Sequence, residues 1–368
     1  MRPLVAKTQV GWEAAGRWSN TRGSAGWVCE SCGKTSAAAW RGGGKLCCEC
    51  GLNDELFRPE TRWLAAEFEA HRSAAKAGAA RARPSPVLRL GLKSLGAIAP
   101  RAAAELGARM FFSPRRARRW TAPNVPIPGN VFRFSVGEWE LACWSWGRGP
   151  VVILVHGWEG YAAQLTHFVQ PLIGAGFRVV AFDMPAHGAS TGRRLSAFGM
   201  AEAIHAVASA FSPVWALVAH SLGGTASIFA MSQGLEIKRV ALLAPAAEPT
   251  HFARRLASWL GFSKARAAGM LERIEHRLGM RLEEAGVLPL VPTMRARLLL
   301  MHDPEDPEVP FDHGKAIAEA WPGARLELLS QMGHRAMLRD PSTIASVAAF
   351  IARPDVHQEL PAPARTGY

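Results

Sequence analysis

The sequence of 368 residues lacks any long hydrophobic run. No apolar stretch approaches the roughly 20 residues that a membrane-spanning helix needs, so no such helix is expected. Residues 1–20 alternate polar and apolar side chains without the continuous apolar core of a secretory signal, and a cytoplasmic location is therefore expected. No internal repeat or low-complexity segment is visible, which excludes a repeat architecture.

Acidic residues are scarce in the first third of the chain. Residues 1–120 hold 21 Lys and Arg against nine Asp and Glu, whereas the whole chain has a formal net charge of +13. The remaining two thirds are therefore almost neutral. Such a split indicates a second function or a docking surface near the N-terminus.

Cysteine is nearly absent outside one short segment. Cys143 alone lies elsewhere, in a predicted strand, where a small buried apolar residue is expected. Two Cys-x-x-Cys pairs enclose 14 residues, and this spacing presents four thiolates to one tetrahedral Zn²⁺ ion. The expected ligands of this structural zinc are Cys29, Cys32, Cys47 and Cys50. Iron is the alternative metal, and a disulfide is disfavoured because no export signal is seen.

Residues 26–53 resemble the GATA-type zinc finger. The similarity lies in Trp40-Arg41, in Leu46 before the second pair and in the exit Cys50-Gly51-Leu52. It implies that nucleic acid or a protein is the partner of the N-terminal segment. The loop between the pairs is shorter than in that family, and acidic residues follow where the family carries a basic tail.

A serine stands at the end of an apolar run. The run Val214–Ala219 is followed by His220 and Ser221, and then by Gly223 and Gly224 before a helix-competent segment. This pattern is typical of a nucleophile elbow of the G-x-S-x-G type, with Ala219 in the first glycine position. Small residues are needed there because the tight turn brings neighbouring backbone close to the serine.

A serine nucleophile needs a base, and the base needs an acid that orients it. The apolar run 297–301 opens into a loop that holds Asp303 and Asp306, and the strand-like run 325–329 leads to His334. We expect His334 to be the general base and Asp306 to orient it, with Asp303 as the competing acid. The chain order of serine, acid and histidine matches one known arrangement of this triad.

Backbone N–H groups are expected to stabilise the oxyanion that forms when the serine attacks. The continuous apolar run Val151–Val155 is typical of a buried parallel strand and ends in His156-Gly157-Trp158. A His-Gly turn in this position donates a backbone N–H to the oxyanion. We expect the two donors to be the N–H groups of Trp158 and Leu222.

Residues 131–354 resemble the α/β-hydrolase superfamily. The resemblance rests on turns in the family's order: His156-Gly157-Trp158, the stretch 183–190, Ala219 to Gly224, Asp306-Pro307-Glu308-Val309-Pro310 and Gly333-His334. It implies a cofactor-free hydrolase that acts through an acyl-enzyme. A serine nucleophile argues against the dehalogenase and epoxide hydrolase branches, which use an aspartate.

The predicted fold class is α/β, with an α/β-hydrolase fold preceded by the small four-cysteine zinc finger. An antiparallel pair at 131–136 and 139–146 precedes strands that alternate with helices, which predicts a mostly parallel sheet covered by helices on both faces. A short helical lid is expected at 247–292, where it would line an acyl pocket or simply pack as a helix pair. The expected divisions are a tail at 1–25, the finger at 26–58, a basic helical linker at 59–125, the catalytic domain at 126–354 and a tail at 355–368.

Two functions follow from these residues. The first is an intracellular serine hydrolase that cleaves small carboxylic esters or thioesters. The alternative is a zinc-finger regulator that binds DNA or protein, in which the hydrolase domain senses a ligand or is inactive. The basic segment 88–119 adds a peripheral membrane or phosphate contact as one interpretation, and a helix packed on the catalytic domain as the other.

Overall fold

The computed structural model describes residues 18–20, 27–29, 35–36, 91, 98–115 and 129–353. Near the N-terminus, β1 (Trp18–Asn20), β2 (Trp27–Cys29) and β3 (Thr35–Ser36) form a small antiparallel sheet. The side chain of Cys29, and the whole of Cys32, Cys47 and Cys50, lie outside the described residues. The predicted zinc site, both tails and most of the linker therefore stay predictions.

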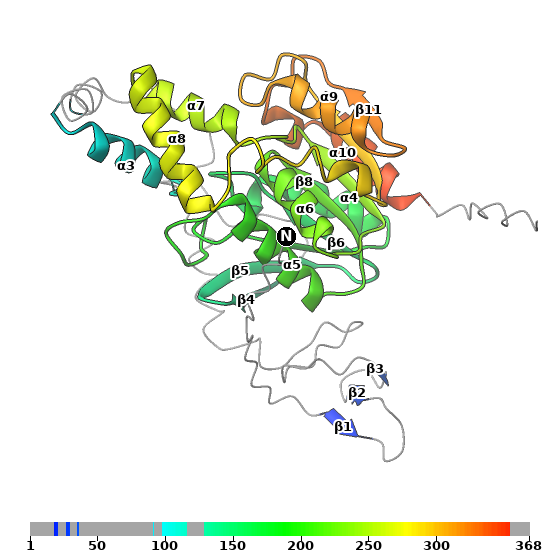
Figure 1. Cartoon of the computed structure of the whole chain (residues 1–368). Helices are drawn as coiled ribbons and strands as arrows, with labels where there is room; N and C mark the ends of the chain where they lie inside the picture. The colour runs from blue at the N-terminus through cyan, green and yellow to red at the C-terminus, as the bar shows by residue number, and fades with distance from the viewer. Residues whose placement is uncertain are drawn as a thin grey trace, which may run out of the picture.

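The main body of the structure is an eight-stranded sheet in the order β11-β10-β9-β8-β6-β7-β5-β4 (Figure 1). Its strands are β4 (Asn130–Val136), β5 (Trp139–Trp146), β6 (Val151–Val155), β7 (Arg178–Phe182), β8 (Val214–His220), β9 (Arg239–Leu243), β10 (Arg297–His302) and β11 (Arg325–Leu328). Strand β5 pairs antiparallel with both β4 and β7, and the other pairs are parallel. The predicted mostly parallel sheet is confirmed.

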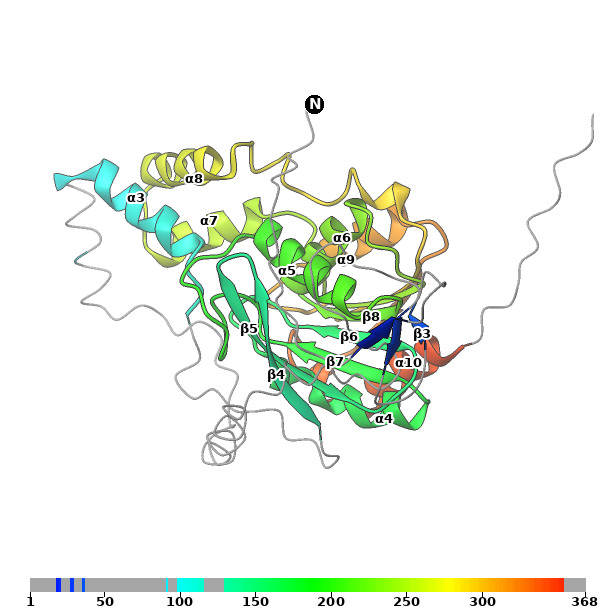
Figure 2. The same ribbon diagram turned by 90° about the horizontal axis from the view of Figure 1, so that it is seen from below.

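Helices cover both faces of this sheet (Figure 2). On one face lie α5 (Ala197–Ala210), α6 (Leu222–Ser232) and α9 (Phe311–Ala320), and on the other lie η1 (Ala162–Phe168), α4 (Val169–Gly174) and α10 (Pro341–Ala352). Every residue of β6, β7 and β9 is buried, because each of these strands packs against helices on both sides. This explains why their sequences are apolar without alternation, apart from the arginine that begins β7 and β9.

The segment between β9 and β10, where a lid is expected, forms a helical layer outside the sheet. It contains α7 (Thr250–Trp259), α8 (Lys264–Leu278) and the short η2 (Val291–Thr293). Helix α3 (Pro100–Phe111) packs against α7 and α8, and both views show the three helices side by side (Figures 1 and 2). Pro100 is the first residue of α3, a position that suits the fixed backbone of proline.

Helix α3 lies before residue 126, where the catalytic domain was expected to begin, yet it shares a buried apolar cluster with the lid. Ala104 and Ala108 of α3 pack there with Leu256, Met270 and Ile274. Of the two interpretations of the basic segment, residues 98–115 therefore fit the second, a helix packed on the catalytic domain. None of the helices in the described ranges is both long enough and apolar enough to cross a membrane.

Candidate active site

Ser221 occupies a strained turn between β8 and α6. Its φ of +54° and ψ of −127° lie in a region that non-glycine residues rarely adopt. A Cβ atom on Gly157 would lie 2.8 Å from the Ser221 Cβ, and one on Gly223 would lie 2.5 Å from the carbonyl oxygen of His156. The small residues around the serine are therefore required by the close approach of β6 to the turn.

This crowding predicts a large stability effect at Gly223. In Gly223→Ala, the new methyl group would meet two backbone carbonyl oxygens, of Val155 and His156, which cannot move aside as a side chain can. We expect the free energy of unfolding to fall by about 1–3 kcal/mol or more. Gly269→Ala is the matched control, since its Cβ would make ordinary contacts at 3.7 Å in a helix interior, where alanine is favoured by up to about 1 kcal/mol. Urea unfolding of both variants checks this, and equal stability of Gly223→Ala and the wild type would contradict it.

His334 and Asp306 form a buried hydrogen-bonded pair beside the same cavity as Ser221. His334 Nδ1 lies 2.7 Å from Asp306 Oδ2. Burial would raise the pKa of the Asp306 carboxyl, but hydrogen bonds from His302, His334 and the Val309 N–H outweigh it and hold the pKa well below its ordinary value. The carboxylate is thus ionised and accepts a hydrogen bond from Nδ1–H of His334, which leaves Nε2 as the basic nitrogen.

The competing acid, Asp303, has a different position. Its Oδ2 accepts the backbone N–H groups of Met332 and Gly333, both at 2.6 Å, and its Oδ1 accepts that of Glu305 at 2.9 Å. Asp303 therefore fixes the loop that carries His334, whereas Asp306 contacts the imidazole itself.

Two further histidines support this pair. His220 Nε2 lies 2.9 Å from the carbonyl oxygen of His334, and the two rings are 4.5 Å apart. Burial, with a smaller contribution from His334, lowers the pKa of His220 well below its ordinary value, so this ring is neutral. His302 Nε2 lies 3.1 Å from the carbonyl oxygen of Val309 and 3.5 Å from Asp306 Oδ2. Both rings contact the backbone around the acid and the base.

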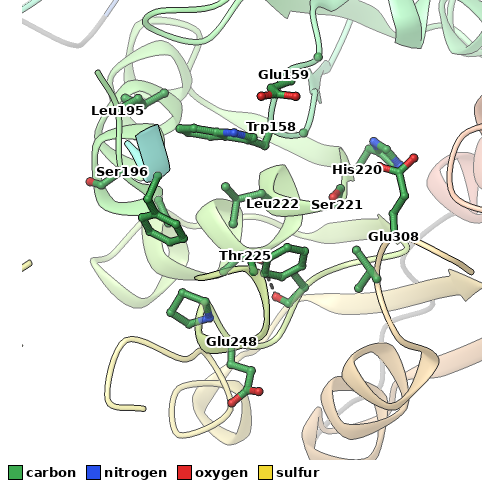
Figure 3. A pocket seen from close by; sticks show the side chains of 18 of the residues that line it. Trp158, Glu159, Leu195, Ser196, His220, Ser221, Leu222, Thr225, Glu248 and Glu308 are labelled. Carbon is green, nitrogen blue, oxygen red and sulfur yellow. Dashed lines mark hydrogen bonds between the residues drawn. The ribbon is translucent and has the colours of Figure 1, made fainter. Parts of the chain in front are cut away.

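Trp158 and Leu222 lie on the cavity next to Ser221 (Figure 3). Trp158 is in a turn closed by a hydrogen bond from the Gly160 N–H to the Gly157 carbonyl, and the Glu159 N–H donates to His187 Nε2. Leu222 is the first residue of α6, where N–H groups have no partner inside the helix and the helix dipole favours negative charge. This arrangement suits an anion that forms at the serine.

The cavity has a volume of about 170 Å³ and is bounded mainly by aromatic and aliphatic side chains. Its apolar lining includes Phe111, Phe112, Trp158, Leu195, Phe198, Leu222, Phe252, Leu256 and Val309.

Among residues 98–115 and 129–353, no group of three or more His, Cys, Asp or Glu is placed to hold a metal ion.

Charged residues that line the cavity connect the lid with the loop that carries Asp306. No pattern in the sequence pointed to these residues. Arg255 of α7 donates from Nη1 to the carbonyl oxygens of Pro307 and Glu308, both at 2.8 Å. Arg335, next to the base, forms an ion pair with Glu308 at 2.9 Å. The lid and the loop that carries Asp306 are therefore joined by directed contacts.

The buried neutral histidines predict a loss of stability in acid. Burial, with a smaller contribution from His187, lowers the pKa of His156 to about 3, and the pKa of His220 is also lowered. Unfolded histidine titrates near pH 6.5, so below that pH the unfolded state binds more protons and the free energy of unfolding falls. At about 1.4 kcal/mol per pH unit for each group, we expect a loss of about 2–4 kcal/mol between about pH 7 and about pH 5. Urea unfolding at the two pH values measures it, and equal stability would contradict it.

Comparisons with known proteins agree with this geometry. Residues 152–347, more than half of the chain, match the model of the alpha/beta hydrolase family, so the chain belongs to that family. Membership of this family supports a hydrolase. No curated protein sequence matches the chain.

Solved structures show the same fold. An esterase of Pyrococcus furiosus is 16% identical, with a TM-score of 0.50 over 65% of this chain and 96% of that one. Est1E of Butyrivibrio proteoclasticus, solved with ferulic acid bound, is 18% identical, with a TM-score of 0.50 over 60% of this chain and its whole length. At these identities the similarity establishes the fold alone.

Proposed function

We propose that the protein hydrolyses carboxylic esters or thioesters through an acyl-enzyme formed on Ser221. The observation that carries this proposal is the buried 2.7 Å pair of His334 and Asp306 beside the cavity into which the strained turn places Ser221. A serine, an imidazole and an ionised carboxylate in these roles activate a hydroxyl that is otherwise a poor nucleophile.

The proposed reaction uses these groups in two steps. The Ser221 Oγ attacks the carbonyl carbon while His334 Nε2 removes its proton, and Asp306 stabilises the imidazolium that forms. The N–H groups of Trp158 and Leu222 donate to the oxyanion. His334 then protonates the leaving alcohol or thiol, and in the second half of the reaction it activates the water that releases the acid.

The cavity favours an apolar acyl group. Its lining is mainly aromatic and aliphatic. Of the charged residues on it, Glu308 pairs with Arg335, Glu159 pairs with Arg115, and Arg255 donates to backbone carbonyl oxygens, while Glu248 is a further carboxylate. An acyl chain buried against this lining gains the ordinary free energy of apolar burial, about 25 cal/mol per Å².

A direct assay tests the proposal. We expect the purified full-length chain to release p-nitrophenol from p-nitrophenyl butyrate, and thiol from a butyryl thioester, well above the rate in buffer. An initial burst of p-nitrophenol, equal to one equivalent of protein, is expected where deacylation is slow. Folded protein that releases neither product would exclude the proposed function.

A further inference from the structure

Residues 100–115 precede the part of the chain that matches the family, yet α3 is built into the lid. A Cβ atom on Gly107 would lie 2.6 Å from the Met270 Sδ, so the backbone of α3 approaches α8 closely. Glu105 of α3 forms ion pairs with Arg273 and Arg277 of α8. Both apolar packing and charge therefore fix α3 on the lid.

The end of the segment 100–115 contacts the active site through hydrogen bonds and an ion pair. The Phe112 carbonyl oxygen accepts the N–H of Leu195 at 2.8 Å. The Arg115 guanidinium binds the carboxylate of Glu159 at 3.0 and 3.1 Å and lies 5.9 Å from the ring of Trp259 in α7. Glu159 follows Trp158, whose N–H is a proposed oxyanion donor, so the segment connects the oxyanion turn with the lid.

The two phenylalanines at the end of α3 face the cavity. Phe111 and Phe112 both line it, their rings meet edge to face at 5.3 Å, and Phe112 is only 8% exposed. Figure 3 shows Leu195 and Ser196 on the side of the cavity away from Ser221, with Trp158 and Leu222 between them. The Phe112 backbone is hydrogen-bonded to Leu195, so Phe112 belongs to the part of the cavity lining that Leu195 forms.

We propose that residues 100–115 form a third lid element and that Phe111 and Phe112 build the end wall of the acyl site. The substrates would then be esters or thioesters of compact apolar acids, with a short chain or a single aromatic ring. The cavity of about 170 Å³ is close to the roughly 150 Å³ apolar cavity that accommodates benzene. This inference rests on the proposed function, because it names the acyl class that the same site accepts.

A series of p-nitrophenyl esters from acetate to dodecanoate tests the wall. In the wild type, we expect kcat/KM for dodecanoate to be at least about tenfold lower than for butanoate. The reason is that each methylene group that does not fit a tight pocket weakens binding of the transition state. In Phe112→Ala, the ratio of dodecanoate to butanoate should rise by about tenfold or more. The matched control is Leu106→Ala on the same helix, because Leu106 is 39% exposed and lies outside the cavity lining, and it should keep the wild-type profile.

A second variant and a binding measurement that needs no turnover also test the end wall. Phe112→Trp adds volume at the wall and should shorten the preferred chain. In the Ser221→Ala background, hexanoic acid should raise Tm more than dodecanoic acid does, and Phe112→Ala should reverse that order. An unchanged chain-length profile and unchanged Tm order in folded Phe112→Ala would overturn the end wall. Failure of the wild type to hydrolyse any ester would overturn the proposed function instead, while the Tm order would still test the wall.

Discussion

The variant Ser221→Ala is expected to lower kcat for p-nitrophenyl butyrate by about 10⁵- to 10⁶-fold, the scale seen when the nucleophile of a serine triad is removed. The physical reason is that no other hydroxyl occupies the strained turn between β8 and the start of α6. The residual rate reflects binding and the oxyanion donors, which the substitution leaves in place.

Ser232→Ala is the matched control for this variant. Ser232 ends α6, the helix that begins directly after Ser221, and its hydroxyl donates to the carbonyl oxygen of Phe229 at 2.8 Å. Removing it should leave kcat unchanged. A Ser221→Ala protein that keeps kcat within about tenfold of the wild type would contradict the assignment of the nucleophile, because triad loss has far larger effects.

The variant Asp306→Asn is expected to lower kcat by about 10⁴-fold with little change in structure. An amide oxygen in place of Oδ1 can still accept the N–H groups of Glu308 and Val309, which the carboxylate accepts at 2.7 and 3.0 Å. The other position would carry an NH₂ group, which cannot accept a hydrogen bond from Nδ1–H of His334. The imidazole would then adopt the wrong tautomer, and its Nε2 would no longer act as the base.

The variant Asp303→Asn distinguishes the role of Asp303, which holds the loop, from that of Asp306, which contacts the imidazole. Asp303 holds the N–H groups of Met332 and Gly333 rather than the imidazole, so its substitution should lower the free energy of unfolding by about 1–3 kcal/mol. Measured well below Tm, its kcat should stay within about tenfold of the wild type, since the hydrogen bond from His334 to Asp306 is kept. A larger loss of kcat in Asp303→Asn than in Asp306→Asn would reverse the two roles.

Much of the fold could be predicted because the strands of a buried parallel sheet are continuous apolar runs. The apolar runs that begin at Val151, Val214 and Arg297 coincide with the starts of β6, β8 and β10. The turns after β6 and β8 could be recognised because close backbone contacts at Gly157 and Gly223 admit only small residues.

The remaining features depend on contacts between distant segments. Helix α3 had an amphipathic pattern, but its partners in α7 and α8 lie far along the chain, so the pattern alone allowed a membrane surface or a packed helix. The choice between Asp303 and Asp306 depends on the geometry of one loop, in which both carboxylates accept backbone N–H groups. The predicted zinc ligands, from Cys29 to Cys50, still await a measurement of metal content.

Labelling with a fluorophosphonate tests the central claim most directly, since this reagent phosphonylates an activated serine. Mass spectrometry of the digested protein should find one phosphonyl group per chain, on the peptide that contains Ser221. Labelling should be strongly slowed in Asp306→Asn. Labelling of a different serine, or equal rates in the wild type and Asp306→Asn, would contradict activation of Ser221 by the pair of His334 and Asp306.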